Sequence, residues 1–279
     1  MQIRFSKMHG LGNDFMVLDG INQTLPELTR EQITHLANRH FGVGFDQLLL
    51  VEKPQSADAE FRYRIFNADG SEVGPCGNGA RCFARFVVDK GRTKNRRIPV
   101  ETASGRLELL LDDNDQITVN MGAPRWSPED IPLHTDAEAD SYFIIADKQA
   151  FEVGAVGLGN PHCTLLVESV DTAKVEFIGP LLESHPDFPA RVNVGFMQLL
   201  SRNHIRLRVY ERGSGETLAC GSGACAAVVI GQRRGFLDHT VQVDLPGGSL
   251  SITYTGEGGI LMTGPATLVY EGVIDLPEK

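Results

Sequence analysis

The stretch CGNGA at residues 76–80 decides how this chain is organised, because it recurs as CGSGA at residues 220–224. Four further matches follow in the same order: GLGN at 10–13 and 157–160, VGFDQLL at 43–49 with VGFMQLL at 194–200, RYRIF at 62–66 with RLRVY at 206–210, and GRL at 105–107 with GSL at 248–250. An ordered set at nearly one offset indicates an internal repeat. We therefore predict two similar lobes about a pseudo-twofold axis, with equivalent residues on opposite walls of one cleft.

Each half alternates between short strand patterns and turn signals, with two helical patterns in the first half. The expected helices cover Arg30–Arg39, which Thr29 can cap, and Asn78–Lys90. The second is apolar over much of its circumference, so it should be largely buried. We predict an α/β fold of the α+β type, in which each lobe is a curved, mostly antiparallel sheet around a central helix.

The predicted lobe boundaries follow the repeat. The N-terminal lobe covers residues 1–121 and the C-terminal lobe covers residues 122–266. Residues 122–141 are rich in Pro, Asp and Glu and have little periodicity, which is typical of a linker. The segment 267–279 contains an alternating strand pattern over Thr267–Asp275, which can pack back on the N-terminal lobe.

Composition narrows the possible functions. The chain has 279 residues, 42% hydrophobic residues and a formal net charge of −10. So acidic a chain disfavours nucleic acid and anionic membranes as partners. We see no secretory signal and no apolar run of about 20 residues, so we expect a cytoplasmic protein. Five cysteines are an odd number, which does not suit a disulfide framework.

Cys76 and Cys220 each stand directly before a glycine-rich turn that opens a helix. The unpaired N–H groups of a helix N-terminus suit a carboxylate, and its partial positive charge favours a thiolate over a thiol. A thiol has an ordinary pKa of about 8.5, which suits proton transfer near neutral pH. Two such cysteines on opposite walls predict inversion at a carbon: one thiolate removes a proton from one face, and the other thiol returns one to the opposite face.

Other interpretations of the cysteines are weaker. We assign Cys82, Cys163 and Cys225 to the core, the usual place of a cysteine; Cys82 and Cys225 lie inside the helices expected to be buried and do not match each other in the repeat. Their spacings from Cys76 and Cys220 do not suit structural zinc. A disulfide between Cys76 and Cys220 would be a product of oxidation. No complete phosphate-binding or dinucleotide-binding motif occurs, and we infer no cofactor and no metal.

The sequence resembles the diaminopimelate epimerase family along essentially its whole length. The resemblance lies in KMHGLGNDF (7–15), GFDQLL (44–49), FNADGSE (66–72), CGNGARC (76–82), GNPHC (159–163), RVN (191–193), YERGSGET (210–217) and CGSGACA (220–226). It implies interconversion of LL- and meso-2,6-diaminopimelate in lysine and peptidoglycan precursor biosynthesis, without a cofactor, by a two-base mechanism with Cys76 and Cys220 as the acid and base.

The resemblance also implies roles for other residues. His162 and Glu211 match residues that adjust the two thiols, and Tyr270 matches a position at a homodimer contact. The positions that hold substrate are Asn13, Gln47, Asn67, Gly77, Asn78, Asn160, Asn193, Glu211, Arg212, Gly221 and Ser222. From pattern alone, Glu211 and Arg212 are equally well explained as an ion pair at a strand end, and His162 as a core residue.

A proline or hydroxyproline racemase is the alternative, because it shares the fold and the two cysteines. Its substrate has one carboxylate and an imino group. A second polar cluster of Asn67, Asn160, Asn193 and Arg212 would then have nothing to bind. The cluster therefore favours a small-molecule substrate with a second amino-acid end. A ligand-binding protein without activity is disfavoured, because both cysteines are present.

Overall fold

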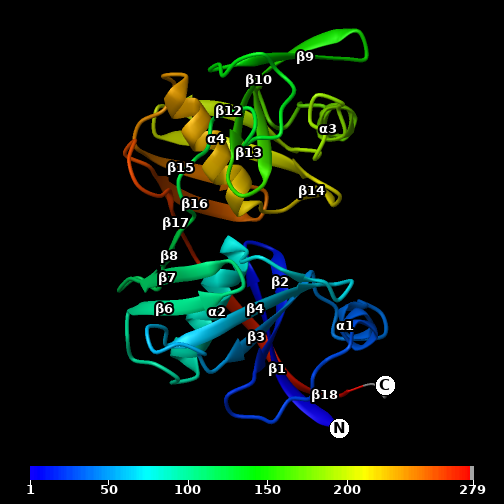
Figure 1. Ribbon diagram of the computed structural model, residues 1–279, viewed down its shortest axis with the longest axis vertical. Helices are drawn as coiled ribbons and strands as arrows, with labels where there is room; N and C mark the ends of the chain where they lie inside the picture. The colour runs from blue at the N-terminus through cyan, green and yellow to red at the C-terminus, as the bar shows by residue number, and fades with distance from the viewer. Residues whose placement is uncertain (277–279) are drawn as a thin grey trace. The chain divides into compact units, whose positions relative to one another are not determined.

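The structure is a computed structural model that describes residues 1–276 (Figure 1). The chain divides into two compact units. The N-terminal unit comprises Met1–Val119 and the segment from Gly264 onward, and the C-terminal unit comprises Asn120–Thr263. Residues 277–279, the end of the C-terminal segment assigned above, lie outside the described part. No helix within residues 1–276 has the length and apolar character needed to cross a membrane.

The N-terminal unit is a mixed sheet with two helices. Its elements are β1 (Gln2–Gly10), β2 (Asn13–Asp19), α1 (Arg30–Ala37), β3 (Gln47–Glu52), β4 (Phe61–Asn67), β5 (Glu72–Val73), α2 (Gly77–Asp89), β6 (Arg97–Thr102), β7 (Gly105–Leu111), β8 (Ile117–Asn120) and β18 (Thr267–Asp275). The main strand order is β18-β1-β2-β3-β4-β6-β7-β8, and β5 also pairs with β4. Only the β2–β3 and β4–β6 pairs are parallel among the pairings of these strands.

The C-terminal unit repeats this arrangement. Its elements are β9 (Tyr142–Ala146), β10 (Gln149–Gly157), β11 (Pro161–Leu166), α3 (Val175–Glu183), β12 (Asn193–Ser201), β13 (His204–Glu211), β14 (Gly215–Thr217), α4 (Gly221–Arg233), β15 (Thr240–Leu245), β16 (Gly248–Thr253) and β17 (Leu261–Gly264). The order is β9-β10-β11-β12-β13-β15-β16-β17, and β14 also pairs with β13. The parallel pairs, β11–β12 and β13–β15, stand at the same places as in the other unit.

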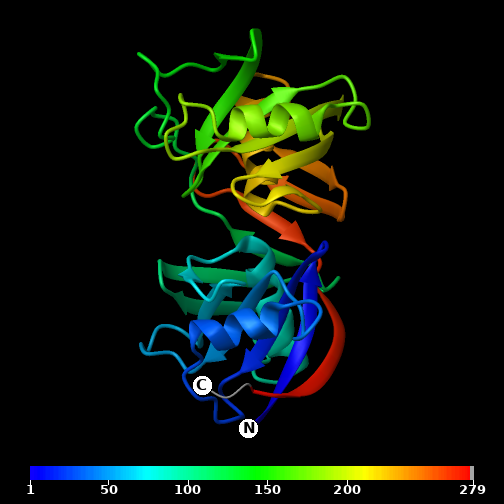
Figure 2. The same cartoon turned by 90° about the vertical axis from the view of Figure 1, so that its right-hand side faces the viewer.

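The two units differ in the strand that begins each sheet. In the C-terminal unit β10 pairs with β9, which directly precedes it in the chain. In the N-terminal unit the corresponding strand, β1, pairs with β18 from the other end of the chain, as Figure 2 shows. The first unit therefore takes its outermost strand from the last residues of the chain.

Each unit has one buried helix enclosed by its sheet. The helix α2 packs against β18, β1, β2 and β3 and also against β7, which lies near the other end of the strand order. The helix α4 likewise packs against β10, β11, β12, β13 and β16 (Figure 1). A helix that meets both ends of a sheet is wrapped by it, so the predicted fold class is confirmed in both units.

Apolar side chains explain why these two helices are central. In α2, Phe83 is fully buried, and its ring lies 5.0 Å from that of Tyr63 and 6.1 Å from that of Phe61, both on β4. In α4 the run from Gly223 to Gly231 is buried throughout. Burial of such side chains contributes about 1.5–3 kcal/mol each, so neither helix is stable apart from its sheet.

The first helix begins as its sequence predicts and ends slightly earlier. The Thr29 hydroxyl accepts from the Gln32 N–H, and the Gln32 side chain accepts from the Thr29 N–H, which completes a capping box. The helix ends at Ala37 instead of Arg39, because Asn38 is extended and the Val43 and Gly44 N–H groups return to the Leu36 carbonyl.

One of the five sequence matches is wrong. In the sheet register, Gln47 on β3 stands opposite Asn67, and the residue pairing Val194↔Tyr210 places Asn193 of β12 opposite Glu211. Gln47 therefore corresponds to Asn193. VGFD at 43–46 lies before β3, whereas VGFM at 194–197 lies within β12, so their similarity arises by chance. The other four matches fall at equivalent places in the two sheets.

The stretch 122–141 is packed more firmly than a linker. Ile131 is fully buried and Leu133 is 5% exposed, and both belong to the hydrophobic core of the C-terminal unit. Arg125 also forms a β-bridge with Gly157. The prediction of a linker from Pro, Asp and Glu content missed these two apolar anchors, which are too few to produce a periodic pattern.

Candidate active site

Cys76 occupies the N-cap position of α2, with extended backbone angles (φ −98°, ψ 131°). Its carbonyl accepts from the Ala80 N–H at 2.8 Å, which starts the helix. The residue is partly exposed. The chain runs from β4 through the short β5 to this position, so Cys76 lies where the chain passes from the sheet into its central helix.

Two predicted substrate-binding asparagines lie beside Cys76. Its Sγ is 3.9 Å from Asn13 Oδ1, and Asn78 Nδ2 donates to the same oxygen at 3.3 Å. The Asn13 amide in turn donates to Asp46 at 3.0 Å, which fixes which end of the amide faces the thiol. The structure therefore brings Asn13, Cys76 and Asn78 together. Asp46, which orients Asn13, was missed by sequence reasoning, although it stands within the matched segment 43–49.

Gln47 and Asn67 form a cross-strand pair in the same unit. Gln47 Nε2 donates to Asn67 Oδ1 at 2.9 Å, and Asn67 Nδ2 donates to Ser71 Oγ at 3.3 Å. They face each other because β3 and β4 are antiparallel in this register. Gln47 begins β3 and Asn67 ends β4, so both amides lie at the edge of the sheet where the chain leaves β4 toward β5 and α2.

Cys220 occupies the equivalent N-cap of α4, and its carbonyl accepts from the Ala224 N–H at 2.9 Å. Its environment is unlike that of Cys76. The residue is only 4% exposed, its thiol donates to Glu211 Oε2 at 3.0 Å, and Ser222 Oγ lies 3.7 Å away. The Thr217 hydroxyl donates to the other Glu211 oxygen at 2.5 Å. Thr217 therefore orients Glu211, a role that sequence reasoning missed even though Thr217 lies in the quoted segment 210–217.

Burial raises the pKa of the Cys220 thiol well above its ordinary value, and the negative charge of Glu211 adds to the effect. Hydrogen bonds from Gly223 N–H and Ser222 act in the opposite direction but do not prevail. The expectation that a helix N-terminus favours the thiolate is therefore wrong for Cys220. Loss of water and a nearby carboxylate outweigh the partial charge of the helix end.

His162 is nearly fully buried on β11, and its Nε2 lies 2.9 Å from Asn160 Oδ1. Burial lowers its pKa to about 3, and the positive charge of Arg212 acts in the same direction. The ring is therefore neutral at physiological pH. Of the two residues that the resemblance assigns to thiol adjustment, Glu211 contacts a thiol directly, and His162 contacts Asn160.

Asn193 and Arg212 are joined through the backbone. The Arg212 N–H donates to Asn193 Oδ1 at 2.9 Å, Asn193 Nδ2 donates to the Pro161 carbonyl at 3.1 Å, and Arg212 Nη1 donates to the Ala190 carbonyl at 3.0 Å. Within residues 1–276 no carboxylate lies at ion-pair distance from the exposed Arg212 guanidinium. The alternative explanation of Glu211 and Arg212 as an ion pair at a strand end is therefore not borne out, and this guanidinium is suited to an anionic ligand.

The second glycine of each Cys-Gly-x-Gly motif has a packing reason. A Cβ at Gly79 would lie 2.5 Å from the Tyr63 hydroxyl, and a Cβ at Gly223 would lie 3.0 Å from Val209. Both neighbours are on the strand that precedes the helix, β4 or β13. These two glycines therefore let each helix approach its own sheet closely.

The remaining cysteines behave as predicted. Cys82, Cys163 and Cys225 are fully buried. Burial raises the pKa of Cys82 to about 12 and that of Cys163 further still. Inert core thiols have these properties. In the described part of the chain, no group of three or more His, Cys, Asp or Glu residues is arranged to hold a metal ion.

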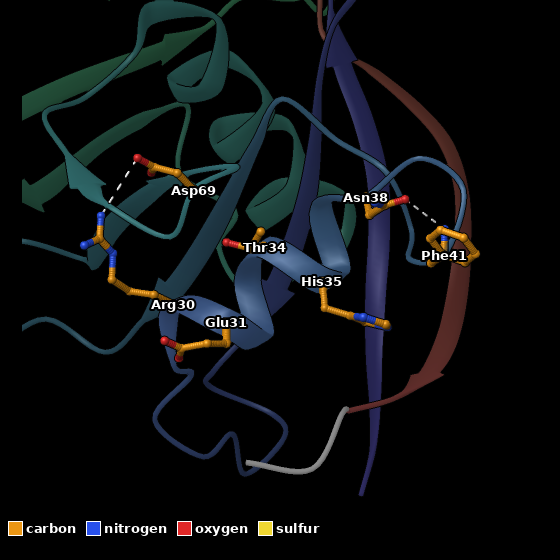
Figure 3. A pocket seen from close by; sticks show the side chains of 7 residues that line it. All are labelled: Arg30, Glu31, Thr34, His35, Asn38, Phe41 and Asp69. Carbon is orange, nitrogen blue, oxygen red and sulfur yellow. Dashed lines mark hydrogen bonds and ion pairs between the residues drawn. The ribbon is translucent and has the colours of Figure 1, made fainter.

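A hollow of about 790 Å³ lies along the outer face of α1 (Figure 3). Arg30, Glu31 and Phe41 are among its lining residues, and Arg30 approaches Asp69 across it at 3.9 Å. None of the predicted site residues lines this hollow. It is an open depression of the surface, and neither Cys76 nor Cys220 lines it.

Tyr270 lies on β18, opposite Lys7 of β1, and is 46% exposed. Its ring packs edge-on against Phe5, with centroids 5.9 Å apart. Leu268, Val269 and Val273 on the same strand are also exposed. This strand therefore presents an unusual density of apolar side chains to its surroundings.

Solved structures share the fold of this chain. A hydroxyproline epimerase from Agrobacterium vitis matches with a TM-score of 0.69 at 14% identity, over 98% of this chain and 92% of that one. A phenazine biosynthesis protein of the PhzF family from Bacillus anthracis matches with a TM-score of 0.68 at 18% identity, over 98% and 99%. At such low identity these similarities establish the fold alone.

Sequence comparison is more specific. The sequence profile of the family described as diaminopimelate epimerase matches residues 5–127 and 154–269. A diaminopimelate epimerase from Thioalkalivibrio sulfidiphilus (strain HL-EbGR7) is 57% identical over 279 residues, which is 99% of this chain and 100% of that protein. The chain belongs to the diaminopimelate epimerase family, and it is an isomerase. The predicted resemblance is confirmed.

Proposed function

We propose that this chain interconverts LL-2,6-diaminopimelate and meso-diaminopimelate by a two-base mechanism without a cofactor, in lysine and peptidoglycan precursor biosynthesis. Family membership and the 57% identical relative support the substrate. One structural observation carries the mechanism. Cys76 and Cys220 occupy the same N-cap position on equivalent helices, α2 and α4.

In the proposed reaction, one thiolate removes the proton from the substrate Cα and the other thiol donates its proton to the opposite face. No other bond is made or broken. Cys220 is the resting thiol, because burial and Glu211 raise its pKa. Cys76 is then the base in that direction. In the reverse direction Cys220 is the base, and Glu211 is placed to receive its proton, since the S–H group already donates to its Oε2.

The intermediate is a planar carbanion beside the substrate carboxylate. We assign its stabilisation to backbone N–H groups at the starts of α2 and α4, from Gly77, Asn78, Gly221 and Ser222. These groups lie in the first turn of their helices, where the backbone has no intrahelical acceptor. Fixed donors of this kind favour charge that develops during the reaction.

The remaining candidates are assigned to binding the substrate. They are Asn13, Gln47, Asn67, Asn160, Asn193, Glu211 and Arg212. Arg212 suits a carboxylate, since its guanidinium has no carboxylate partner in the described chain. Such a set matches a substrate with a second amino-acid end. We assign to His162 an influence on a thiol as a neutral ring, in agreement with its lowered pKa.

We further propose a cytoplasmic homodimer that acts on a small molecule and does not bind nucleic acid or membranes. The apolar side chains along β18, including the half-exposed Tyr270, support β18 as the dimer contact. The net charge of −10 supports the absence of polyanionic partners.

The decisive experiment incubates the purified protein with LL-diaminopimelate in deuterium oxide, with a reducing agent and no cofactor. Loss of the α-proton signal by NMR, together with formation of the meso isomer, is the expected result. Absence of exchange with this substrate, followed by exchange with proline or hydroxyproline, would replace the proposed substrate.

A further inference from the structure

Glu183 is a buried carboxylate for which the proposed reaction has no use. It is the last residue of α3 and is only 2% exposed. The C-terminal end of a helix carries partial negative charge, and burial removes the water that stabilises a carboxylate. An acidic side chain in this place is costly unless other groups hold it directly.

Both Glu183 carboxylate oxygens are used. Oε1 accepts from the Gly213 N–H at 2.9 Å, and Oε2 accepts from the Arg191 guanidinium at 2.5 Å. The Glu183 main-chain carbonyl also accepts from the Val192 N–H at 3.0 Å. One residue therefore joins two segments that are distant in sequence: residues 191–192 directly before β12, and Gly213, which follows the end of β13 at Glu211.

The two partners of the carboxylate share a rare backbone conformation. Arg191 has φ 59° and Gly213 has φ 75°, so both are left-handed. This region is unfavourable for arginine, because its Cβ approaches the backbone. Bonds to Glu183 offset that strain, and they hold each segment in a sharp turn.

Each turn lies next to a proposed substrate-binding residue. Arg191 stands two residues before Asn193, and Gly213 directly follows Arg212. Asn193 and Arg212 are themselves joined by a 2.9 Å hydrogen bond. Arg191 is already paired with the Glu183 carboxylate. Of the two arginines in these segments, Arg212 is therefore the one whose guanidinium has no carboxylate partner within the described residues.

We infer that Glu183 is a positioning residue, which fixes the two loops that present Asn193 and Arg212 to the second amino-acid end of the substrate. The inference rests on the proposed function. Glu183 acts through Arg191 and Gly213 and does not take part in proton transfer. Its loss should therefore weaken substrate binding much more than the chemical step.

The test compares KM and kcat for LL-diaminopimelate in Glu183→Ala, Glu183→Gln and Arg191→Gly. We expect Glu183→Ala to raise KM at least about tenfold, within the hundredfold that an ångström-scale displacement can cost, with kcat little changed. Glu183→Gln keeps an oxygen that accepts from Gly213, so its KM should rise less. Arg191→Gly removes the guanidinium and accepts the positive φ without strain, so it should resemble Glu183→Gln even if Glu183→Ala folds poorly.

Asp244→Ala is the matched control. Asp244 is a carboxylate of the same unit that accepts from His204, Gln242 and Ser249, and it contacts neither loop. Two outcomes would overturn the inference. One is an unchanged KM in the variants of Glu183 and Arg191. The other is a loss of activity in these variants that, as in Asp244→Ala, is fully explained by a smaller fraction of folded protein. An unmodified protein that does not act on diaminopimelate would instead overturn the proposed function, and the inference with it.

Discussion

The starts of α2 and α4 hold the same residue in the same backbone position, yet their surroundings differ. Cys76 is partly exposed and lies beside the neutral amides of Asn13 and Asn78. Cys220 is buried, and its thiol donates a hydrogen bond to the carboxylate of Glu211. The duplicated scaffold therefore supplies two equivalent N-cap positions, and burial together with a carboxylate on the neighbouring strand raises the pKa of the thiol in one of them.

The register explains the difference. Asn67 at the end of β4 and Glu211 at the end of β13 occupy corresponding places. Asn67 stands opposite Gln47, the first residue of β3, and Glu211 stands opposite Asn193, the first residue of β12. One unit has an amide where the other has a carboxylate. This difference at one strand end, together with the deeper burial of Cys220, makes the two cysteines unequal.

The largest expected effect tests whether both cysteines are essential. Cys76→Ala and Cys220→Ala should each reduce epimerisation at least about 10³-fold, because each removes a group that transfers a proton. Isomer analysis with LL- and meso-diaminopimelate measures this. Cys225→Ala is the control, because it changes a buried thiol of α4 outside the N-cap; it should lower the melting temperature and retain the chemistry. Activity retained in either N-cap variant would break the comparison.

The second effect tests the carboxylate that distinguishes the two sites. Glu211→Gln removes the charge that raises the pKa of Cys220, so that pKa should fall and the basic limb of the pH–rate profile should move to lower pH. We expect kcat to fall about 10²-fold, because the proton acceptor of Cys220 is also lost. Glu216→Gln, which changes a carboxylate paired with Arg208, should leave the pH profile in place. A profile unaltered in Glu211→Gln would show that Glu211 does not act on the thiol.

The third effect uses the difference in exposure. Iodoacetamide should modify Cys76 before Cys220, because Cys76 is partly exposed whereas Cys220 is 4% exposed and held as a thiol. Peptide mass spectrometry of samples taken over time measures the order. The buried Cys82 is the internal reference and should react last or not at all. Earlier modification of Cys220 would contradict the assignment of Cys220 as the resting thiol.

The smallest effect concerns stability. The His162 pKa is about 3 in the folded protein, below its ordinary 6.5, so the unfolded chain gains a proton that the folded chain does not. Stability should therefore be lost as the pH falls from 6.5 toward 3, by up to about 1.4 kcal/mol per pH unit from this residue. His162→Gln should remove that part of the slope in urea unfolding. Equal slopes in the two proteins would mean that the ring is protonated when folded.

Much of the fold could be predicted because the same sequence motifs occur in the same order in both units. The helix starts after Cys76 and Cys220 agreed with the structure. The match between residues 43–49 and 194–200 failed, because identical letters can stand at different registers and only strand pairing tells them apart. Ile131 and Leu133 were missed because two apolar anchors make no periodic signal.

The site was predictable in its residues and less so in its chemistry. The motifs supplied both cysteines and the amides. Burial of Cys220, and its 3.0 Å contact with Glu211, depend on how β13 packs beside α4, which no local pattern contains. The thiolate expected at a helix N-terminus failed for that reason. The effect of desolvation on a pKa depends on every neighbour in space, not on sequence spacing.

The pairing of β18 with β1 has a consequence for synthesis of the chain. The N-terminal unit receives its outermost strand only when residues 267–275 leave the ribosome, after the whole C-terminal unit. Until then β1 presents an open strand edge, and such edges invite pairing between chains. Even a short C-terminal truncation should therefore damage the first half of the protein, whereas the second half already contains all of its strands.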